Sequence, residues 1–296
     1  MSVTKLQKDH VVRATAADGS VRAIATYTRA TVEEARRVHE LSRTATAALG
    51  RTLSAGVMMG SMMKGKRDAL SIVFTGDGPL KNITVTAKSD GSVKGYVGNP
   101  RASLPSQMGE KLKVGGIVGK GTLRVIYDIA MREPYSGVVE IQTGEIADDL
   151  AYYFASSDQV PSAVLLGVLL NDDSSVREAG GLIIQMMPGA SDELAAELEA
   201  RVARMPQLTT MLRDGETPED ILERVLGDKE LKILERTPAV FRCDCSRERT
   251  EKLLALMGED ELQSMIDEGK DVEMSCAFCN KKYAYSVDDL KRITAR

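Results

Sequence analysis

Cysteine is scarce in this chain and confined to one end of it. The first 242 of its 296 residues contain none, and four follow as a C-x-C pair, Cys243 and Cys245, and a C-x-x-C pair, Cys276 and Cys279. Two such pairs, separated by 30 residues, favour a single four-thiolate site that forms when a loop brings the pairs together. This pattern is the strongest indication of function in the sequence.

Histidine is equally scarce, with only His10 and His39 present. Neither lies in an arrangement typical of a Ser-His-Asp or Cys-His catalytic centre, and His39 is predicted to be a packing or surface residue of a helix. The segment from Gly119 to Thr122 resembles a phosphate-binding loop, but Gly121 stands where the Walker pattern needs Ser or Thr after the lysine. We therefore predict neither an enzyme nor a nucleotide-binding protein.

An excess of positive charge and a long apolar segment are also absent. The net charge is −4 and the pI about 5.5, so the composition provides no general attraction to nucleic acid or to an anionic membrane. The longest strongly apolar run, residues 163–170, is far shorter than the ~18 to 20 residues that span a bilayer. Residues 1–15 lack the apolar centre of a secretory signal. We expect a soluble cytoplasmic protein, whose clustered cysteines bind metal or sense oxidants rather than form permanent disulfides.

The length predicts two or more domains, and we expect an α+β fold in three parts. The first part, residues 1–189, is an N-terminal mixed sheet domain with packed helices. A capping-box pattern at residues 31–34 opens a long helical stretch, which Gly50 or Gly56 is expected to break. A second helical segment follows with a stripe of methionines, a pattern typical of a core although methionine also suits adaptable binding surfaces. The stripe consists of Met58, Met59, Met62 and Met63.

Short β-branched runs separated by glycine-containing turns predict the strands of this first part. They form an antiparallel meander that ends in a closing pair. The predicted strands are residues 70–74, 82–86, 92–97, 121–129, 136–142, 161–170 and 176–187, with a helix at 146–155.

Residues 190–236 are predicted to be a charged, amphipathic helical linker. From Ser191 to Arg236 there are 12 acidic and 7 basic residues. Such short helices are marginally stable alone, because most helical stability comes from packing. The linker must therefore pack against a neighbouring part of the protein, and it is expected to unfold when that packing weakens. Its narrow apolar stripes are Leu194, Leu198, Val202 and Met205, then Ile221, Leu222, Val225 and Leu226.

Residues 237–296 are predicted to be a small cysteine module. Ser246 caps one helix, Asp260 begins a second, and a strand, the C-x-x-C turn and another strand form a hairpin typical of zinc knuckles, before a last helix at Ser286. With 10 basic and 12 acidic residues, the module lacks the basic surface of a nucleic-acid-binding ribbon. No βαβ unit surrounds the C-x-x-C pair, which argues against a thioredoxin-like role.

Four thiolates suit one tetrahedral zinc ion per chain, and the C-x-C spacing makes an iron–sulfur cluster the weaker alternative. Since protein ligands fill all four positions, no position is left for a substrate. A purely structural site is the simpler hypothesis, because a module of 60 residues has a small core that zinc stabilises by on the order of 10 kcal/mol. Loss of that energy unfolds the module, so a switch is the second hypothesis.

Two features favour the switch. Metal-bound cysteine is already deprotonated, which is the form that oxidants attack. Each cysteine also has a neighbour two or three residues away that can resolve a sulfenic acid. Of the three possible pairings, Cys243–Cys245 and Cys276–Cys279 close the shortest loops, and strain in a C-x-C disulfide keeps it reduced until oxidant is abundant.

The cysteine pattern, together with three segments of the N-terminal part, resembles the heat shock protein 33 family of redox-activated holdase chaperones. The resemblance covers the whole chain. The three segments are Gly76-Asp-Gly-Pro-Leu80, Gly95-Tyr-Val-Gly-Asn-Pro100 and Tyr135-Ser-Gly-Val-Val-Glu-Ile-Gln-Thr-Gly-Glu145.

This resemblance implies a folded, inactive reduced form in which Cys243, Cys245, Cys276 and Cys279 bind zinc. In the oxidised form it implies disulfides Cys243–Cys245 and Cys276–Cys279, zinc release, an unfolded C-terminal module and an opened linker. A homodimer then binds unfolding client proteins without ATP. The main alternative is a constitutive zinc-ribbon binding protein with a purely structural site, and an enzyme is third.

Overall fold

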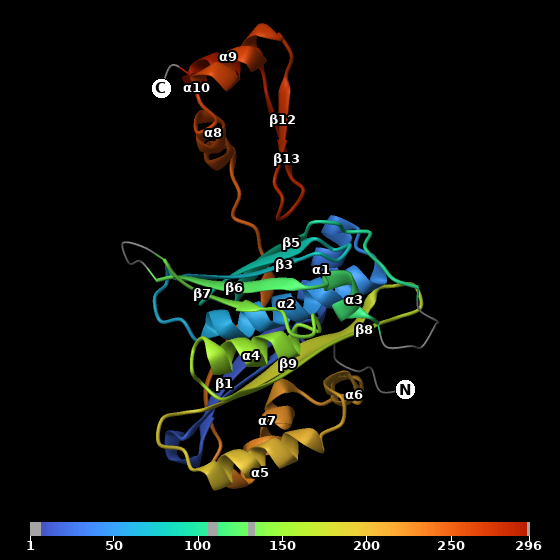
Figure 1. Ribbon diagram of the computed structural model, residues 1–296, viewed down its shortest axis with the longest axis vertical. Coiled ribbons are helices and arrows are strands. Elements are labelled where there is room, and N and C mark those ends of the chain that lie inside the picture. The colour runs from blue at the N-terminus through green and yellow to red at the C-terminus, as the bar shows by residue number, and fades with distance from the viewer. Residues whose placement is uncertain (1–6, 106–111, 130–133, 295–296) are drawn as a thin grey trace. The chain divides into compact units, whose positions relative to one another are not determined.

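Figure 1 shows the computed structural model of the chain, which describes residues 7–105, 112–129 and 134–294. The chain forms two compact units, Met1–Arg242 and Cys243–Arg296. Both units contain helices and strands, so the predicted α+β fold is confirmed. Within the described ranges, none of the helices is long and apolar enough to cross a membrane.

The strands of the first unit form two sheets. One has five strands in the order β10-β1-β2-β9-β8, and the other has six in the order β11-β5-β4-β3-β6-β7. All neighbours are antiparallel except β11, which runs parallel to β5. The strands are β1 His10–Ala16, β2 Val21–Tyr27, β3 Ala69–Gly76, β4 Asn82–Lys88, β5 Ser92–Val97, β6 Gly121–Asp128, β7 Tyr135–Glu140, β8 Ser162–Leu170, β9 Val176–Met186, β10 Lys232–Pro238 and β11 Val240–Phe241.

Helix α2 lies between the two sheets, with β4 and β5 against one side of it and β8 and β9 against the other (Figure 1). Of its 19 residues, all but Arg43 and Arg51 are buried, as expected for a helix whose every side faces a sheet or another helix. Met58 and Met59 are buried in this core, while Met62 and Met63 lie beyond the end of the helix and pack partly buried against it. The helices of the sheet domain are α1 Arg29–His39, α2 Arg43–Ser61, α3 Val114–Val118 and α4 Ala147–Ser156, with a 3-10 turn, η1, at Ala17–Gly19.

The start of α1 differs from the predicted capping box at residues 31–34. The helix begins at Arg29, and the carboxylate that caps it belongs to Asp9, which accepts hydrogen bonds from the amides of Ala30 at 3.1 Å and Thr31 at 2.6 Å. Free amides at a helix start need an acceptor, and here a residue distant in sequence provides it. A local pattern could not indicate this partner.

The break in the long helical stretch was also predicted at the wrong place. It falls between α1 and α2, where Glu40 adopts a left-handed backbone conformation with φ 49°. Gly50 and Gly56, the predicted breaks, lie inside α2. A Cβ atom at Gly50 would lie 2.6 Å from Val32 Cγ1, and one at Gly56 would lie 2.8 Å from Val85 Cγ1. Both glycines therefore permit close approach to neighbouring elements instead of ending the helix.

Three strands of the five-stranded sheet were not predicted. Strands β1 and β2 form a hairpin around a turn that contains Asp18 and Gly19. Strand β10 occupies part of the segment that was expected to be helical, and it pairs with β1 along its length. Its pairing partner is more than 200 residues earlier in the chain, so the long-range ladder, not the local charge pattern, decides its structure.

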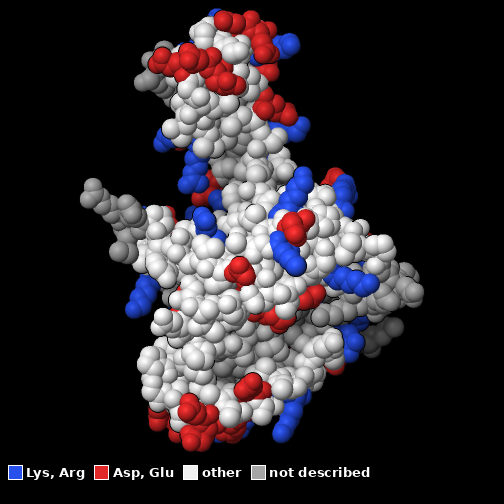
Figure 2. All heavy atoms as spheres, viewed as in Figure 1, with Lys and Arg blue, Asp and Glu red and all other residues white. Residues whose placement is uncertain are grey.

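The three linker helices are α5 Asp192–Ala203, α6 Leu208–Arg213 and α7 Pro218–Leu226, followed by a 3-10 turn, η2, at Gly227–Lys229. Helices α6 and α7 pack against the five-stranded sheet, and α5 packs against α7. Ile221, Leu222 and Leu226 are fully buried and share a core with Val12, Ala23 and other residues of β1, β2 and β9. The exposed side of α5 is acidic, and Figure 2 shows this charge at the bottom of the view. The support on which the linker depends is thus the outer face of the N-terminal sheet.

The second unit contains the predicted helices and hairpin. Ser246 caps α8 by accepting a hydrogen bond from the Arg249 amide at 3.3 Å. A small core of six buried residues joins the elements, comprising Leu254, Leu262, Tyr283, Tyr285, Leu290 and Ile293. The elements are α8 Arg247–Ala255, α9 Glu259–Asp267, β12 Val272–Ser275, β13 Lys282–Tyr285 and α10 Val287–Thr294.

Candidate metal centre

The C-x-x-C pair lies in the turn of the β12–β13 hairpin. Ser275 and Lys282 are the last paired residues of the ladder, and the Cys276 amide donates to the carbonyl of Lys281 at 3.0 Å. Inside the turn, the Asn280 amide donates to the Cys276 carbonyl at 2.8 Å. These bonds fold the chain back on itself so that Cys276 and Cys279 are held on one tight turn.

The C-x-C pair lies in the segment just before α8. The side chain of Arg249, in the first turn of that helix, donates to the Asp244 carbonyl at 3.0 Å and forms an ion pair with its carboxylate at 2.8 Å. Asp244 is the residue between the two cysteines, so the helix start fixes the segment that carries them. The sequence predicted Ser246 as the cap but not this arginine.

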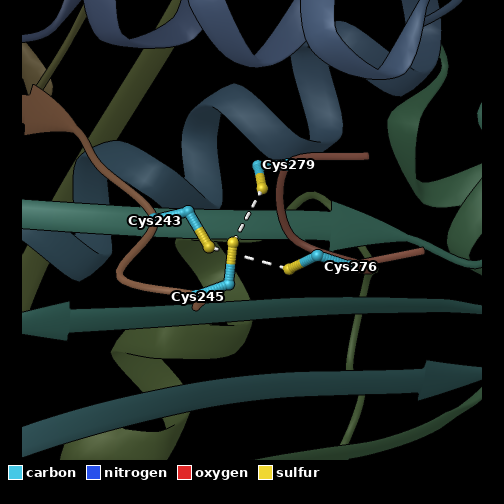
Figure 3. Close-up of side chains that lie close together, drawn as sticks. All are labelled: Cys243, Cys245, Cys276 and Cys279. Carbon is cyan, nitrogen blue, oxygen red and sulfur yellow. Dashed lines mark hydrogen bonds between the residues drawn. The ribbon is translucent and has the colours of Figure 1, made fainter. Parts of the chain in front are cut away.

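The structure brings all four predicted cysteines together (Figure 3). Their sulfur atoms lie within 4.8 Å of one another, and all four side chains are partly buried. Two contacts cross between the pairs: Cys245 Sγ lies 3.4 Å from Cys279 Sγ, and Cys243 Sγ lies 3.7 Å from Cys276 Sγ. The four cysteines are free thiols in this structure.

These separations fit a single tetrahedral ion. A tetrahedron with metal–sulfur distances of about 2.3 Å has sulfur–sulfur edges of about 3.8 Å, close to the observed values. The several atoms of an iron–sulfur cluster would separate the sulfurs more widely. The donor set of four thiolates is the one typical of structural zinc, and no ligand position is left for water or substrate.

The protein environment shifts the pKa values of the cysteine thiols in different directions. Burial raises the pKa of Cys243 and of Cys279. Burial acts in the same direction on Cys245, but the hydrogen bond from Tyr283 and the contacts with the neighbouring thiols outweigh it and lower the pKa of Cys245 to about 7. The Tyr283 hydroxyl donates to Cys245 Sγ at 3.2 Å. Tyr283 was not among the site residues predicted from the sequence, although the alternation of Tyr283 and Tyr285 on β13 places both on the buried face.

In the segment around Lys120 that resembles a phosphate-binding loop, a backbone amide donates to a carboxylate of the protein itself. Asp77 Oδ1 accepts the Lys120 amide at 2.7 Å, and a Cβ at Gly78 would lie 2.4 Å from the carbonyl oxygen of Ile117. The segment from Gly76 to Leu80, which resembles the family's sequence, therefore has a structural role in the tight packing of two loops. His39 packs edge-on against Phe241, with the ring centres 6.5 Å apart, as a packing residue would.

The fold and the cysteine site define a class of protein in which a large α+β unit is followed by a small module with four clustered cysteines. A family model described as Hsp33 protein matches residues 9–286. The 33 kDa chaperonin of Clostridioides difficile is 49% identical over 287 residues, which cover 97% of this chain and 98% of that protein. The 33 kDa chaperonin of Agathobacter rectalis is 48% identical over 285 residues, which cover 96% of this chain and 99% of that protein.

Among solved structures, the crystal structure of the 33 kDa chaperonin, or heat shock protein 33 homolog, of Thermotoga maritima is similar to this one. The TM-score is 0.89 at 33% identity, and the match covers 98% of each chain. The chain belongs to the Hsp33 family. The names of the matching proteins are those of chaperonins, and they indicate no enzymatic family.

Proposed function

We propose that this protein is a redox-regulated, ATP-independent holdase that binds unfolding proteins in the cytoplasm during oxidative stress. The observation that carries the proposal is the pairing of two features: four clustered cysteines in one unit, and an apolar sheet face under short charged helices in the other. The family membership supports the chaperone activity. In the reduced form, Cys243, Cys245, Cys276 and Cys279 hold one zinc ion.

Bound zinc would keep the four sulfurs as thiolates and join the hairpin turn to the segment before α8. We assign the oxidised pairs as Cys243–Cys245 and Cys276–Cys279, which rests on the short loops and on the family resemblance. Each pair of thiolates gives two electrons to one peroxide molecule, which takes up two protons from solvent and leaves as two water molecules. In the reduced geometry each sulfur contacts a sulfur of the other pair, so these contacts must be lost as the disulfides form.

Loss of the four-sulfur centre removes most of the stability of the second unit. Among its described residues, 243–294, the core contains only six buried hydrophobic side chains, which is too few for a module of this size to fold securely alone. Unfolding of this unit releases the chain that follows Arg242, and we propose that the strand and helices before it then loosen. Because α7 buries Leu222 and Leu226 on the sheet, its departure uncovers an apolar surface for clients.

The surface under the linker suits unfolded chains of many sequences. Its residues on β1, β2 and β9 include Val12, Ala14, Ala23, Ala25 and Leu182, which are small or aliphatic and provide no charge that would select one partner. Binding energy then comes from apolar burial, so no ATP is required. We propose that the opened form is a homodimer, and that re-reduction with zinc restores the closed form.

The alternative is a constitutive binding protein whose four-cysteine site is only structural, and the small core of the second unit favours it. One experiment separates the two. The zinc-loaded, reduced protein is treated with hydrogen peroxide at heat-shock temperature while a chelating dye reports zinc release and light scattering reports aggregation of a client. The holdase proposal expects suppression of scattering only after about one zinc per chain has left, and reversal by dithiothreitol with zinc. If zinc leaves while the client still aggregates, the site is structural.

A further inference from the structure

The second unit has two tyrosines of the same strand whose rings are buried alike but whose hydroxyl groups have different partners. On β13, Tyr283 is 7% exposed and Tyr285 is fully buried. The Tyr285 hydroxyl donates to the Arg247 carbonyl at 3.1 Å and also contacts the Thr250 hydroxyl. The Tyr283 hydroxyl instead donates to the sulfur of Cys245 at 3.2 Å.

The position of the Tyr283 hydroxyl is set by the packing of its ring. The ring belongs to the core of the unit, Met274 lies opposite it in the β12–β13 ladder, and the ammonium group of Lys281 lies 5.3 Å from its centre. The hydroxyl therefore cannot turn away from Cys245 without disturbing the core. The hydrogen bond to sulfur is a fixed part of the centre.

We propose that Tyr283 is a positioning residue that restrains the oxidation of Cys245 and so sets the amount of oxidant that opens the centre. A hydrogen bond donated to a thiolate withdraws electron density from sulfur, which lowers its nucleophilicity. In the oxidation step, sulfur gives an electron pair to one oxygen of a peroxide, the O–O bond breaks, and the other oxygen leaves as hydroxide. Removal of the phenol hydroxyl makes the sulfur a better nucleophile in this step.

Tyr283→Phe and Tyr285→Phe in the full-length chain form a matched pair. Each removes one hydroxyl from a buried ring of the same strand, but only the first removes a bond to sulfur. With zinc bound and well below the melting temperature of both variants, we expect peroxide to release zinc about threefold to tenfold faster from Tyr283→Phe, because the sulfur that has lost its hydrogen bond is the better nucleophile. For Tyr285→Phe we expect a rate within about twofold of the unchanged protein.

A spectroscopic measurement tests the sulfur directly. With cobalt(II) in place of zinc, the sulfur-to-cobalt charge-transfer band should move to longer wavelength in Tyr283→Phe and stay in place in Tyr285→Phe. An unmoved band and an unchanged release rate in Tyr283→Phe would overturn the proposal, as would equal acceleration in both variants, which indicates general loosening of the unit. These readouts do not involve a client, so they stand or fall separately from the proposed holdase activity.

Discussion

Gly167 on β8 lies directly opposite Gly180 on β9, and linker helix α6 packs over this pair. A Cβ atom at Gly167 would lie 2.6 Å from Cγ2 of Thr209, and one at Gly180 would lie 2.9 Å from Cδ1 of Leu212. Because these two adjacent positions have no side chains, helix α6 packs closely against the sheet there. Shape complementarity therefore holds the linker at this point, in addition to the burial of its apolar stripe.

We predict that Gly167→Ala displaces α6 from the sheet, because the new methyl group and Thr209 cannot occupy the same space. Overpacking of this kind costs about 1 to 3 kcal/mol. Amide hydrogen exchange of residues 208–213 should become faster, and suppression of client aggregation should begin at lower oxidant concentration. The matched control is Gly167→Ala with Thr209→Ser, which removes the clashing methyl group. If the second change does not restore slow exchange, close packing over Gly167 is not what holds α6 on the sheet.

The buried apolar stripe of α7 leads to a second prediction. Leu222 is fully buried, and Leu222→Asp places an unpaired carboxylate in the core that α7 shares with the sheet. Burial of this carboxylate costs roughly 3 kcal/mol or more, which exceeds the free energy that holds a short linker helix on the sheet. We expect this variant to suppress client aggregation without oxidant while its zinc remains bound.

Leu253→Asp is the control for that experiment, because Leu253 is a helical leucine that is 54% exposed. It should leave both stability and activity unchanged. An inactive Leu222→Asp protein whose linker is demonstrably unfolded would contradict the inhibitory role of the linker.

Glu219 on α7 connects the linker to two strands. It accepts a hydrogen bond from Arg236 at 2.6 Å and contacts the His10 ring at 3.2 Å. Burial opposes its charge, but the hydrogen bonds from Arg236 and His10 outweigh burial and hold the pKa of Glu219 below its ordinary value of 4.5. An acid with a lowered pKa stabilises the fold above its unfolded-state pKa, and this contribution disappears as the pH falls through the folded-state value.

We therefore expect Glu219→Gln to lower the free energy of unfolding by roughly 0.5 to 1 kcal/mol at pH 7, because the group is partly exposed and its ion pairs are weakened by solvent. The difference from the unchanged protein should shrink as the pH is lowered below 4.5, the ordinary pKa of the group. Urea unfolding at several pH values measures it. Glu223→Gln, an exposed change on the same helix, should show no such trend, and a difference that grows toward low pH would refute the assignment.

Removal of metal from the reduced protein should unfold one unit and spare the other. The second unit has a core of six residues, whereas the first has two extensive cores that do not include the cysteines. After treatment with a strong zinc chelator, amides of β12 and β13 should lose protection from hydrogen exchange while those of β3 and β4 keep it. Added zinc should restore the first group. Unchanged protection of the hairpin would show that the four sulfurs do not stabilise the unit.

Local signals predicted the second unit well. The cap at Ser246 and the hairpin around Cys276 depend on residues close in sequence, and the spacing of the cysteines was sufficient to predict their cluster. The contact of Tyr283 with Cys245 could not be predicted in this way, because it depends on which face of the hairpin meets a segment 38 residues earlier. Alternation identifies the face but not the partner.

The first unit shows the same limit at a larger scale. The meander from β3 to β7 follows from β-branched runs and glycine turns, and it was predicted with errors of a few residues. The first hairpin was not predicted, although the Asp18-Gly19 turn and the alternating residues around it are a local signal for it. That β10 joins β1, and that α2 lies between two sheets, depends on long-range packing that no local window contains.

The burial of methionine in the first unit has a consequence for durability. Peroxide converts exposed methionine to a polar sulfoxide, which disrupts an apolar core. Met58, Met59 and Met211 are each no more than 2% exposed, and the described part of this unit contains no thiol. A protein that works in the presence of peroxide, as we propose for this one, thus has these three core sulfurs shielded from oxidation, whereas Met62, Met63, Met186, Met187 and Met205 of the same unit are only partly buried. The cores of the sheet domain should therefore keep their packing through repeated exposures, with oxidation of this unit concentrated on its partly buried methionines.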